Sequence, residues 1–159
     1  MTALLRRAGE GDDFAAILAL VQESFAYMEA RIDPPSSMHR LTPESVAGHA
    51  RDEEIWIVED GQGGLAACVF FTRKPGRLYL GKMAVRQDCR GRGLSRRMVE
   101  KAAERAVALR LPLLELETRI ELVENHRTFA RMGFVKTGEN AHAGYSRPTS
   151  ITMQRPASG

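Results

Sequence analysis

The chain is poor in the residues that hold disulfide-rich or metal-dependent domains together. Its 159 residues include only two cysteines, Cys68 and Cys89, so no disulfide framework is expected. These cysteines and the four scattered histidines show no metal-ligand spacing, so we expect no metal. Aromatic residues make up only 6% of the sequence, so the core must be mostly aliphatic.

Long apolar runs, repeats and low-complexity segments are also absent. The first 13 residues are rich in charge, and no apolar run of signal-peptide or membrane-span length follows them. We therefore expect a cytoplasmic protein without a membrane partner. A hydrophobic content of 43% and a charged content of 27% suit a folded domain and exclude global disorder. We expect a single domain over residues 1–159, with a flexible tail at 155–159.

The order of the apolar patterns predicts an α+β fold. Phe14, Leu18, Val21 and Phe25 form one apolar face of a first helix that Asp12 or Asp13 caps. Thr42 and Pro43 open a second helix, and Asn125 is expected to cap a short late helix that ends at Gly133. A long third helix is expected at 93–110, and strands at 4–7, 54–59, 64–72, 77–85, 113–118, 134–137 and 150–153. The prediction is a mixed, mostly antiparallel sheet of six to seven strands with about four helices on its faces.

A glycine-bearing turn between a strand and the long helix is the most informative segment. The start of a helix offers unpaired backbone N–H groups and the positive end of the helix dipole. Glycines in the turn remove side chains that would keep a ligand away, and arginines add positive charge. The segment from 86 to 97 contains one acid, Asp88, and five arginines: Arg86, Arg90, Arg92, Arg96 and Arg97. This pattern predicts a phosphate site.

Three phosphate motifs and one structural alternative compete for this turn. The string G-x-x-x-x-G-K-[ST] does not occur, and a dinucleotide fingerprint starting at Gly91 fails because its sixth position is Arg96. The pattern R-x-x-G-x-[GA] is met by Arg90, Gly93 and, imperfectly, Ser95. A helix with a solvated basic first turn is the alternative that remains open.

The ordered elements resemble the GNAT superfamily of acyl-CoA-dependent N-acyltransferases. The resemblance lies in the strand end at 83–85, the turn at 90–95, the long helix and the segment 129–134. It implies that the sheet splays after Val85 and that the amides from Gly91 to Arg96 hold the pyrophosphate of acetyl-CoA. It also implies that the strand end pairs with the pantetheine arm. The implied cofactor contacts are Met83, Ala84, Val85, Arg90, Gly91, Arg92, Gly93, Leu94, Ser95, Arg96, Asn125 and Phe129.

The sequence departs from the family pattern in its late helix. Many members carry there a tyrosine that protonates the leaving thiolate, and this chain has Phe129, which has no proton to give. Asn125 also lies about one turn closer to Gly133 than the corresponding family residue. Ser95 replaces the usual glycine or alanine, but its amide and hydroxyl can still donate to a phosphate.

The acid or base must therefore come from another residue. One branch of the family places a glutamate base where this chain has Tyr79, and a phenol with a pKa of about 10 is a poor base but a useful acid or water-holder. His126, which titrates near neutral pH, and Tyr145, in a late loop, are the other catalytic candidates. Packing of Tyr79 on the sheet face, an exposed His126 and a plain loop aromatic at Tyr145 are the alternatives.

The acceptor site is expected from the first-helix region, which walls the substrate cleft in this family. The loop at 31–39 adds polar variety to that region. Glu115 and Glu117 alternate with leucines, so both face the side opposite to those leucines and one of them reaches the cleft, unless both are solvated. The predicted substrate residues are Phe25, Tyr27, Met28, Arg31 and Glu117.

These features give three functional hypotheses. The first is an N-acetyltransferase that moves an acetyl group from acetyl-CoA to a primary amine of a small molecule or peptide, by direct attack in a ternary complex. A homodimer is compatible with it. The second is a non-catalytic acyl-CoA sensor, which the loss of the tyrosine at Phe129 keeps open. The third, a nucleic-acid binder using the arginines from 86 to 97, is disfavoured because that segment lacks interleaved aromatics, so we expect no nucleic-acid partner.

Overall fold

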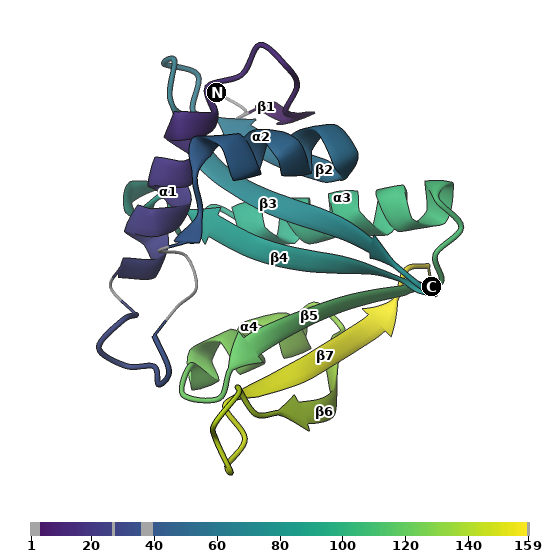
Figure 1. Cartoon of the computed structure of the whole chain (residues 1–159). Coiled ribbons are helices and arrows are strands. Elements are labelled where there is room, and N and C mark those ends of the chain that lie inside the picture. The colour runs from purple at the N-terminus through teal and green to yellow at the C-terminus, as the bar shows by residue number, and fades with distance from the viewer. Residues whose placement is uncertain (1–3, 27, 36–39, 159) are drawn as a thin grey trace.

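The computed structural model describes residues 4–26, 28–35 and 40–158 (Figure 1). Seven strands form one mixed sheet in the order β1-β2-β3-β4-β5-β7-β6. All neighbouring strands are antiparallel except β4 and β5, which are parallel. The strands are β1 (Leu4–Arg7), β2 (Glu54–Glu59), β3 (Leu65–Lys74), β4 (Arg77–Val85), β5 (Leu113–Arg119), β6 (Val135–Asn140) and β7 (Ser150–Pro156). The predicted α+β class and strand number are confirmed.

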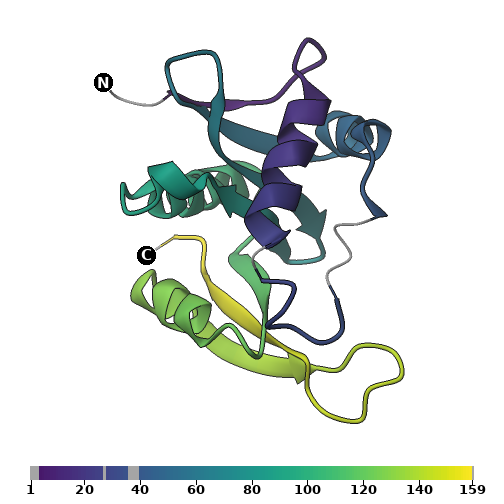
Figure 2. The same cartoon turned by 90° about the vertical axis from the view of Figure 1, so that its left-hand side faces the viewer.

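Helices cover both faces of this sheet, as Figures 1 and 2 show. The described part of the chain contains α1 (Phe14–Ala26), α2 (Pro43–Asp52), α3 (Leu94–Ala108) and α4 (Val123–Arg131), with a 3-10 turn, η2, at Gln87–Cys89. One core lies under α1 and α2, and a larger core lies under α3 and α4. The two cores make the sheet a central layer, so residues that alternate along a strand belong to different faces.

The start of each early helix follows from its capping residues. Asp13 Oδ1 accepts a hydrogen bond from the Ala16 amide at 3.0 Å, whereas Asp12 binds Arg6 instead. Thr42 caps α2 through the Ser45 amide at 3.1 Å, and Ser45 bonds back to the Thr42 amide, which forms a capping box.

The sheet opens between β4 and β5. Their pairing begins at Arg77 and Leu113 and stops at Leu80 and Leu116, so among the described residues the second half of β4 has no paired strand on that side. The register between β3 and β4 also shifts. Cys68 pairs with Ala84 and Phe70 pairs with Gly81, so β4 has one residue more than β3 between these two pairs. Lys82 occupies this bulge with a φ of 51°, a conformation uncommon for a residue with a side chain. The bulge therefore marks where the sheet splays.

Two expectations about the C-terminal third are wrong. Asn125 does not cap α4, because the helix begins at Val123 with Leu122 at the N-cap position. Residues 155–157 are not a flexible tail, because Arg155 and Pro156 lie in β7 beside β5, and the Ala157 amide donates to the Pro112 carbonyl at 2.8 Å. The β5–β7 pairing runs past Gln154, where the sequence alone shows no further strand pattern.

Candidate active site

A cleft of about 750 Å³ lies where β4 and β5 separate. We call it the central cleft. Its lining comes from the second half of β4, the end of β5, the first turns of α3 and α4, and the C-terminal end of α1 with the segment that follows. Far-apart parts of the sequence therefore meet at the opening of the sheet.

The turn before α3 forms one end of the central cleft. Gly91 and Gly93 have φ angles of +78° and +76°, which side chains rarely adopt, and a Cβ atom at either position would meet no atom within 4 Å. Glycine is required here by backbone conformation rather than by crowding. Gly93 is the N-cap of α3 and offers no side chain to the helix. The first amides of α3 are therefore left for a ligand, as the sequence predicts.

The charge on this turn comes from a smaller set of arginines than the sequence indicates. Arg90, Arg92 and Arg96 are exposed, and Arg90 and Arg96 line the central cleft. Arg86 is instead paired with Asp60 at 2.8 Å and with Asp88 at 2.6 Å. Arg86 therefore stabilises the turn between β2 and β3 and is not part of the basic surface around the α3 start.

The strand end at Met83, Ala84 and Val85 lines the central cleft beyond the last pair with β5. Its peptide groups on that side are not paired with a strand in the described chain. Met83 and Val85 pack against the core under α3, whereas Ala84 belongs to the core under α1. This backbone edge can accept an extended ligand as if it were another strand.

Helix α4 closes the cleft from the other wall. Asn125 and Phe129 both line it, together with Thr128. The Phe129 ring packs edge-on against Phe134, with centroids 5.8 Å apart. Phe129 thus contributes an apolar surface at the position where a tyrosine would bring a hydroxyl group.

Tyr79 and Glu117 meet on the face opposite to α3. The Tyr79 hydroxyl donates to Glu117 Oε2 at 3.4 Å, and Glu117 Oε1 accepts from Asn140 Nδ2 at 2.9 Å and from Ser150 Oγ at 3.3 Å. Burial raises the pKa of Tyr79 far above its ordinary value, and the charge of Glu117 raises it further. The phenol therefore stays neutral, which agrees with a role as donor and excludes a role as base near neutral pH.

The other two catalytic candidates do not line the central cleft. The Tyr145 hydroxyl donates to Asp33 Oδ1 at 2.5 Å, and Arg147 binds the same carboxylate at 2.9 Å. The hydrogen bond to Asp33 raises the pKa of Tyr145. It also connects the loop before β7 to the segment after α1. His126 Nε2 lies 3.0 Å from the Arg119 carbonyl oxygen, a contact within the late part of the chain.

The predicted acceptor residues divide in the same way. Phe25, Met28 and Glu117 line the central cleft, whereas Arg31 binds Glu124 at 3.1 Å and does not line it. Tyr27 and the predicted loop residues 36–39 lie outside the described residues. Of the predicted pair on β5, Glu115 turns away from solvent and binds Arg77 at 2.9 Å and Gln154 at 2.7 Å.

The sequence analysis does not identify three basic residues that line the cleft: Lys82, Arg119 and His142. Arg119 donates to the Pro34 carbonyl at 2.7 Å, and His142 bonds to Thr149. Lys82 precedes the strand end in an apolar stretch, where a bulge has no sequence signal beyond the neighbouring Gly81. Its position in the cleft is decided by the shift in register.

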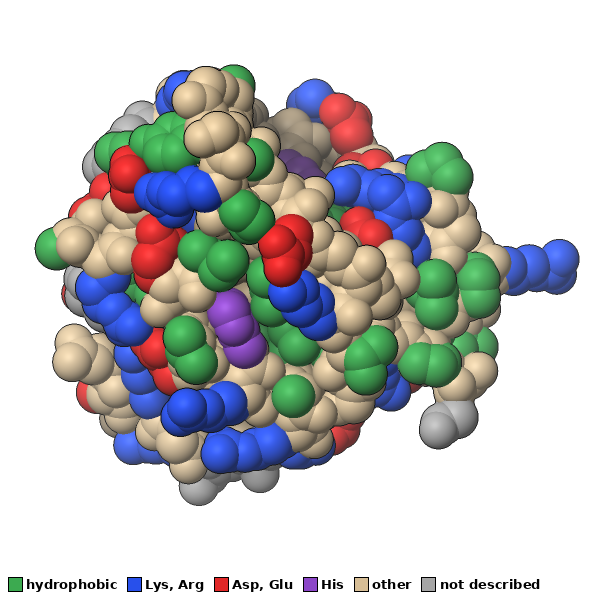
Figure 3. Space-filling model, turned by 90° about the horizontal axis from the view of Figure 1, so that it is seen from below, with side chains coloured by type: hydrophobic (Ala, Val, Ile, Leu, Met, Phe, Trp, Pro, Cys, Tyr) green, Lys and Arg blue, Asp and Glu red, His purple; other side chains and the backbone are tan. Residues whose placement is uncertain are grey.

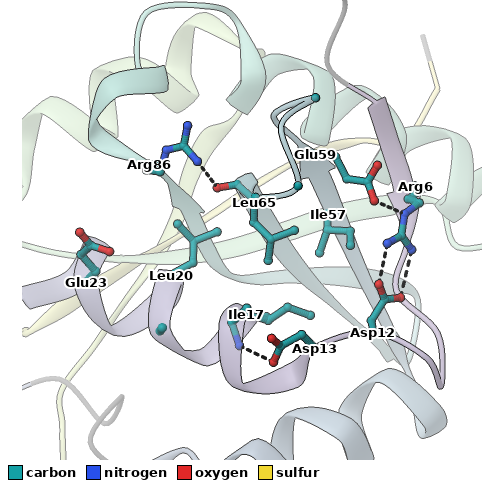
Figure 4. A pocket seen from close by; sticks show the side chains of 15 residues that line it. Arg6, Asp12, Asp13, Ile17, Leu20, Glu23, Ile57, Glu59, Leu65 and Arg86 are labelled. Carbon is teal, nitrogen blue, oxygen red and sulfur yellow. Dashed lines mark hydrogen bonds and ion pairs between the residues drawn. The ribbon is translucent and has the colours of Figure 1, made fainter.

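A second hollow, of about 580 Å³, lies between α1 and the β2–β3 turn (Figure 4). Its floor is apolar, with Ile17, Leu20 and Ile57. Its cationic groups are already neutralised, because Arg6 binds Asp12 and Glu59, at 2.5 and 2.9 Å. This hollow therefore lacks the free cations that a phosphate would need. No group of three metal-ligating side chains occurs among the described residues.

The face of the molecule shown in Figure 3 gives no support to the nucleic-acid hypothesis. On the face in Figure 3, basic side chains are interspersed with acidic and apolar ones. Within the described residues, no helix is long and apolar enough to cross a membrane.

Known proteins show the same architecture. The chain matches the solved structure of a GNAT-family acetyltransferase from Listeria monocytogenes with a TM-score of 0.74 and 16% identity, over 97% of this chain and 94% of that chain. It matches an acetyltransferase from Bacillus subtilis in complex with CoA with a TM-score of 0.68 and 15% identity, over 98% of this chain and 99% of that chain. It also matches the ribosomal-protein-S18-alanine N-acetyltransferase from Escherichia coli with a TM-score of 0.67 and 17% identity, over 99% of this chain and 96% of that chain. No curated protein matches the chain. The model of the Acetyltransferase (GNAT) family matches residues 15–134. The chain therefore belongs to the GNAT acetyltransferase family, whose members use acyl-CoA.

Proposed function

We propose that this protein transfers an acetyl group from acetyl-CoA to a primary amine, by direct attack in a ternary complex. One observation carries the proposal: a single cleft joins an open helix start surrounded by arginines to a carboxylate on the opposite side of the sheet. The helix start with its arginines suits a phosphorylated acyl donor, and the carboxylate suits an amine.

The residues of the turn suit the phosphates of acetyl-CoA. The amides of Leu94, Ser95 and Arg96 start α3 without a side-chain cap, and the helix dipole favours negative charge there. Arg90, Arg92 and Arg96 are exposed beside these amides and add charge-assisted hydrogen bonds. The thioester of acetyl-CoA supplies an activated acyl group, and the free edge at 83–85 would align it with the acceptor.

Glu117 is the residue best placed to receive the proton of the acceptor. A lysine-like amine has a pKa of about 10.4, so it enters as an ammonium ion and must lose a proton before attack. The Glu117 carboxylate attracts the ammonium, and Tyr79, Asn140 and Ser150 fix its orientation. In this proposal Glu117 takes the proton directly or through a water that the neutral Tyr79 phenol helps to hold.

The leaving group needs little assistance. Phe129 cannot donate a proton, but a thiol has a pKa of only about 8.5, so a thiolate is a tolerable leaving group near neutral pH. Positioning of the amine against the thioester then supplies most of the rate. An acyl-CoA sensor would need the phosphate turn but not an ordered carboxylate opposite it, so the Tyr79–Glu117 pair favours the enzyme.

A thiol-release assay tests the proposal. The protein is mixed with acetyl-CoA and pooled primary amines, and products are identified by mass increase. We expect thiol release that depends on an amine, and acetylation on nitrogen. Tight coenzyme A binding without release for any amine would instead support the sensor. Propionyl-CoA, run in parallel, shows whether the acyl group is restricted to acetyl.

A further inference from the structure

Lys82 is a charged residue in the central cleft whose role the proposed transfer does not explain. Its side chain is half-buried, and its Nζ atom lies 5.4 Å from the centroid of the Phe70 ring. Phe70 belongs to the core under α1, so the ammonium lies on the face of the sheet opposite to α3 and the phosphate turn. Lys82 is therefore on the acceptor side.

The other charged groups on this side of the cleft already have partners. Glu117 is held by three hydrogen bonds, and Arg119 donates to the carbonyls of Pro34 and Pro35. For Lys82 the described residues provide no carboxylate and no hydrogen-bond acceptor, and the Phe70 ring compensates only part of its lost hydration. Burial accordingly lowers the pKa of Lys82.

Nearby groups do not supply a counter-charge. His49 packs against Phe70 with ring centroids 5.0 Å apart, and burial lowers its pKa, so it is a neutral neighbour. The backbone of Lys82 is held at a φ of 51°, so the bulge fixes where this side chain starts. A half-buried cation at a fixed position, without a protein partner, is a typical binding group for an anion.

We propose that Lys82 determines acceptor specificity by binding an anionic group of the acceptor, so that the preferred substrate is a small amine that also carries a carboxylate or phosphate, as an amino acid does. This inference rests on the proposed acetyl transfer. The cleft then has two opposite charges for a zwitterion: the Glu117 carboxylate for its ammonium and the Lys82 ammonium for its anion. A desolvated cation attracts such a group more strongly than an exposed one does.

Matched acceptors and two variants test the inference. Amino acids are compared with their amides, and O-phosphoethanolamine with ethanolamine, in wild type, Lys82→Met and Lys82→Arg. Both variants keep a long unbranched side chain at the strained backbone position, and Lys82→Arg also keeps the charge. We expect Lys82→Met to lower kcat/KM at least tenfold for the acceptors that carry a carboxylate or phosphate, mainly through KM, and Lys82→Arg to restore much of it. The acceptors without an anionic group should lose less than twofold. The pair in which wild type shows the stronger preference for the member with the anionic group tells whether carboxylate or phosphate is bound.

Two results would overturn the inference. One is an equal loss, or no loss, in Lys82→Met for acceptors with and without an anionic group. The other is a fall in coenzyme A affinity, which would place Lys82 in the donor site. Calorimetry of the same acceptors with the coenzyme A complex keeps the test independent of turnover. If no amine is acetylated, the proposed function fails, but a Lys82-dependent preference for amines with an anionic group in this binding experiment would still support Lys82 as an anion-binding group.

Discussion

The Tyr79 hydroxyl group lies 3.4 Å from Glu117 Oε2, across the point where β4 and β5 separate. The two residues come from strands that are paired up to Leu80 and Leu116 and then diverge. The hydrogen bond therefore places a neutral phenol and a carboxylate together at the entrance of the opening. On the proposed acceptor side of the cleft, this pair supplies both a hydrogen-bond donor and a carboxylate.

Replacing the carboxylate should affect turnover more than replacing the phenol. We expect Glu117→Gln to lower kcat by about 10²- to 10⁴-fold, because the amide oxygen can still accept from Asn140 and Ser150 but the amide cannot take a proton. Tyr79→Phe should lower kcat about tenfold or less, because the carboxylate keeps Asn140 and Ser150 as donors. Steady-state kinetics and coenzyme A calorimetry on both variants check this, and coenzyme A affinity should stay within twofold. If Glu117→Gln is as active as wild type while His126→Ala or Tyr145→Phe is inactive, the proton leaves by a different path.

Negative charge in the phosphate turn should abolish tight donor binding. Gly93→Asp puts a carboxylate beside the first amides of α3, so coenzyme A affinity should fall more than tenfold, or more than about 1.4 kcal/mol. Gly93→Asn has nearly the same shape without the charge and should lose less. Calorimetry on folded variants measures the difference. Gly76→Asp, at a φ of +75° in the β3–β4 turn, carries the same backbone strain and should bind normally. Equal affinities for Gly93→Asp and wild type would refute the phosphate site.

A hydroxyl group at position 129 should supply the missing general acid. The Phe129 ring lines the cleft and packs edge-on against Phe134, so Phe129→Tyr retains the ring while adding a donor. We expect kcat to rise by up to about 10²-fold, the low end of general acid catalysis. The gain should fade as pH approaches about 10, where a phenol ionises. An unchanged kcat across the pH range would mean that the thiolate leaves without help.

A partly buried ion pair between β2 and α3 should control acid stability. Glu54 is 7% exposed and binds Arg105 at 2.7 Å and the Trp56 indole at 2.8 Å. Burial alone would raise the pKa of Glu54, but these contacts outweigh it and the pKa is lowered. Since the folded pKa lies below the unfolded one, the stabilisation is complete above about pH 4.5 and is lost as pH falls through the folded pKa.

Removal of the Arg105 guanidinium should therefore lower the free energy of unfolding. We expect Arg105→Met to lower the free energy of unfolding by about 2 kcal/mol at pH 7, below the value for a fully buried pair because Arg105 is partly exposed. Urea unfolding from pH 3 to 7 measures it, and the variant should lose less stability on acidification than wild type. The control is Arg73→Met. Its partner Glu53 is the C-cap residue of α2, and the Arg73 side chain is 56% exposed, so this change should cost under about 1 kcal/mol. Equal costs would mean that the Glu54 pair contributes no more than a surface pair.

Local patterns in the sequence are sufficient for most of the elements and for the backbone geometry of the glycine turn before α3. The one-sided apolar stripe of α1, the Thr42–Pro43 start of α2 and the glycine turns between β2, β3 and β4 depend on neighbouring residues, which a sequence displays directly. The same holds for the turn at Gly91 and Gly93, because positive φ angles and an open helix start are local properties. The end of β7 was missed because Arg155 and Pro156 are held by pairing with β5, not by their own propensities.

The side chains on the proposed acceptor side depend on tertiary structure. The sequence favours Tyr79 over His126 and Tyr145 as the catalytic candidate, but only packing shows that Tyr79 meets Glu117 while Tyr145 meets Asp33. Lys82 had no sequence signal, because its place in the cleft depends on a register shift against β3 that turns the strand after Gly81. The sequence by itself determined a glycine turn with an open helix start in an α+β fold, since short-range backbone geometry follows from neighbouring residues. The identity of the groups that face the acceptor depended on strand register and on the splay of β4 from β5, which are set by contacts between residues distant in the chain.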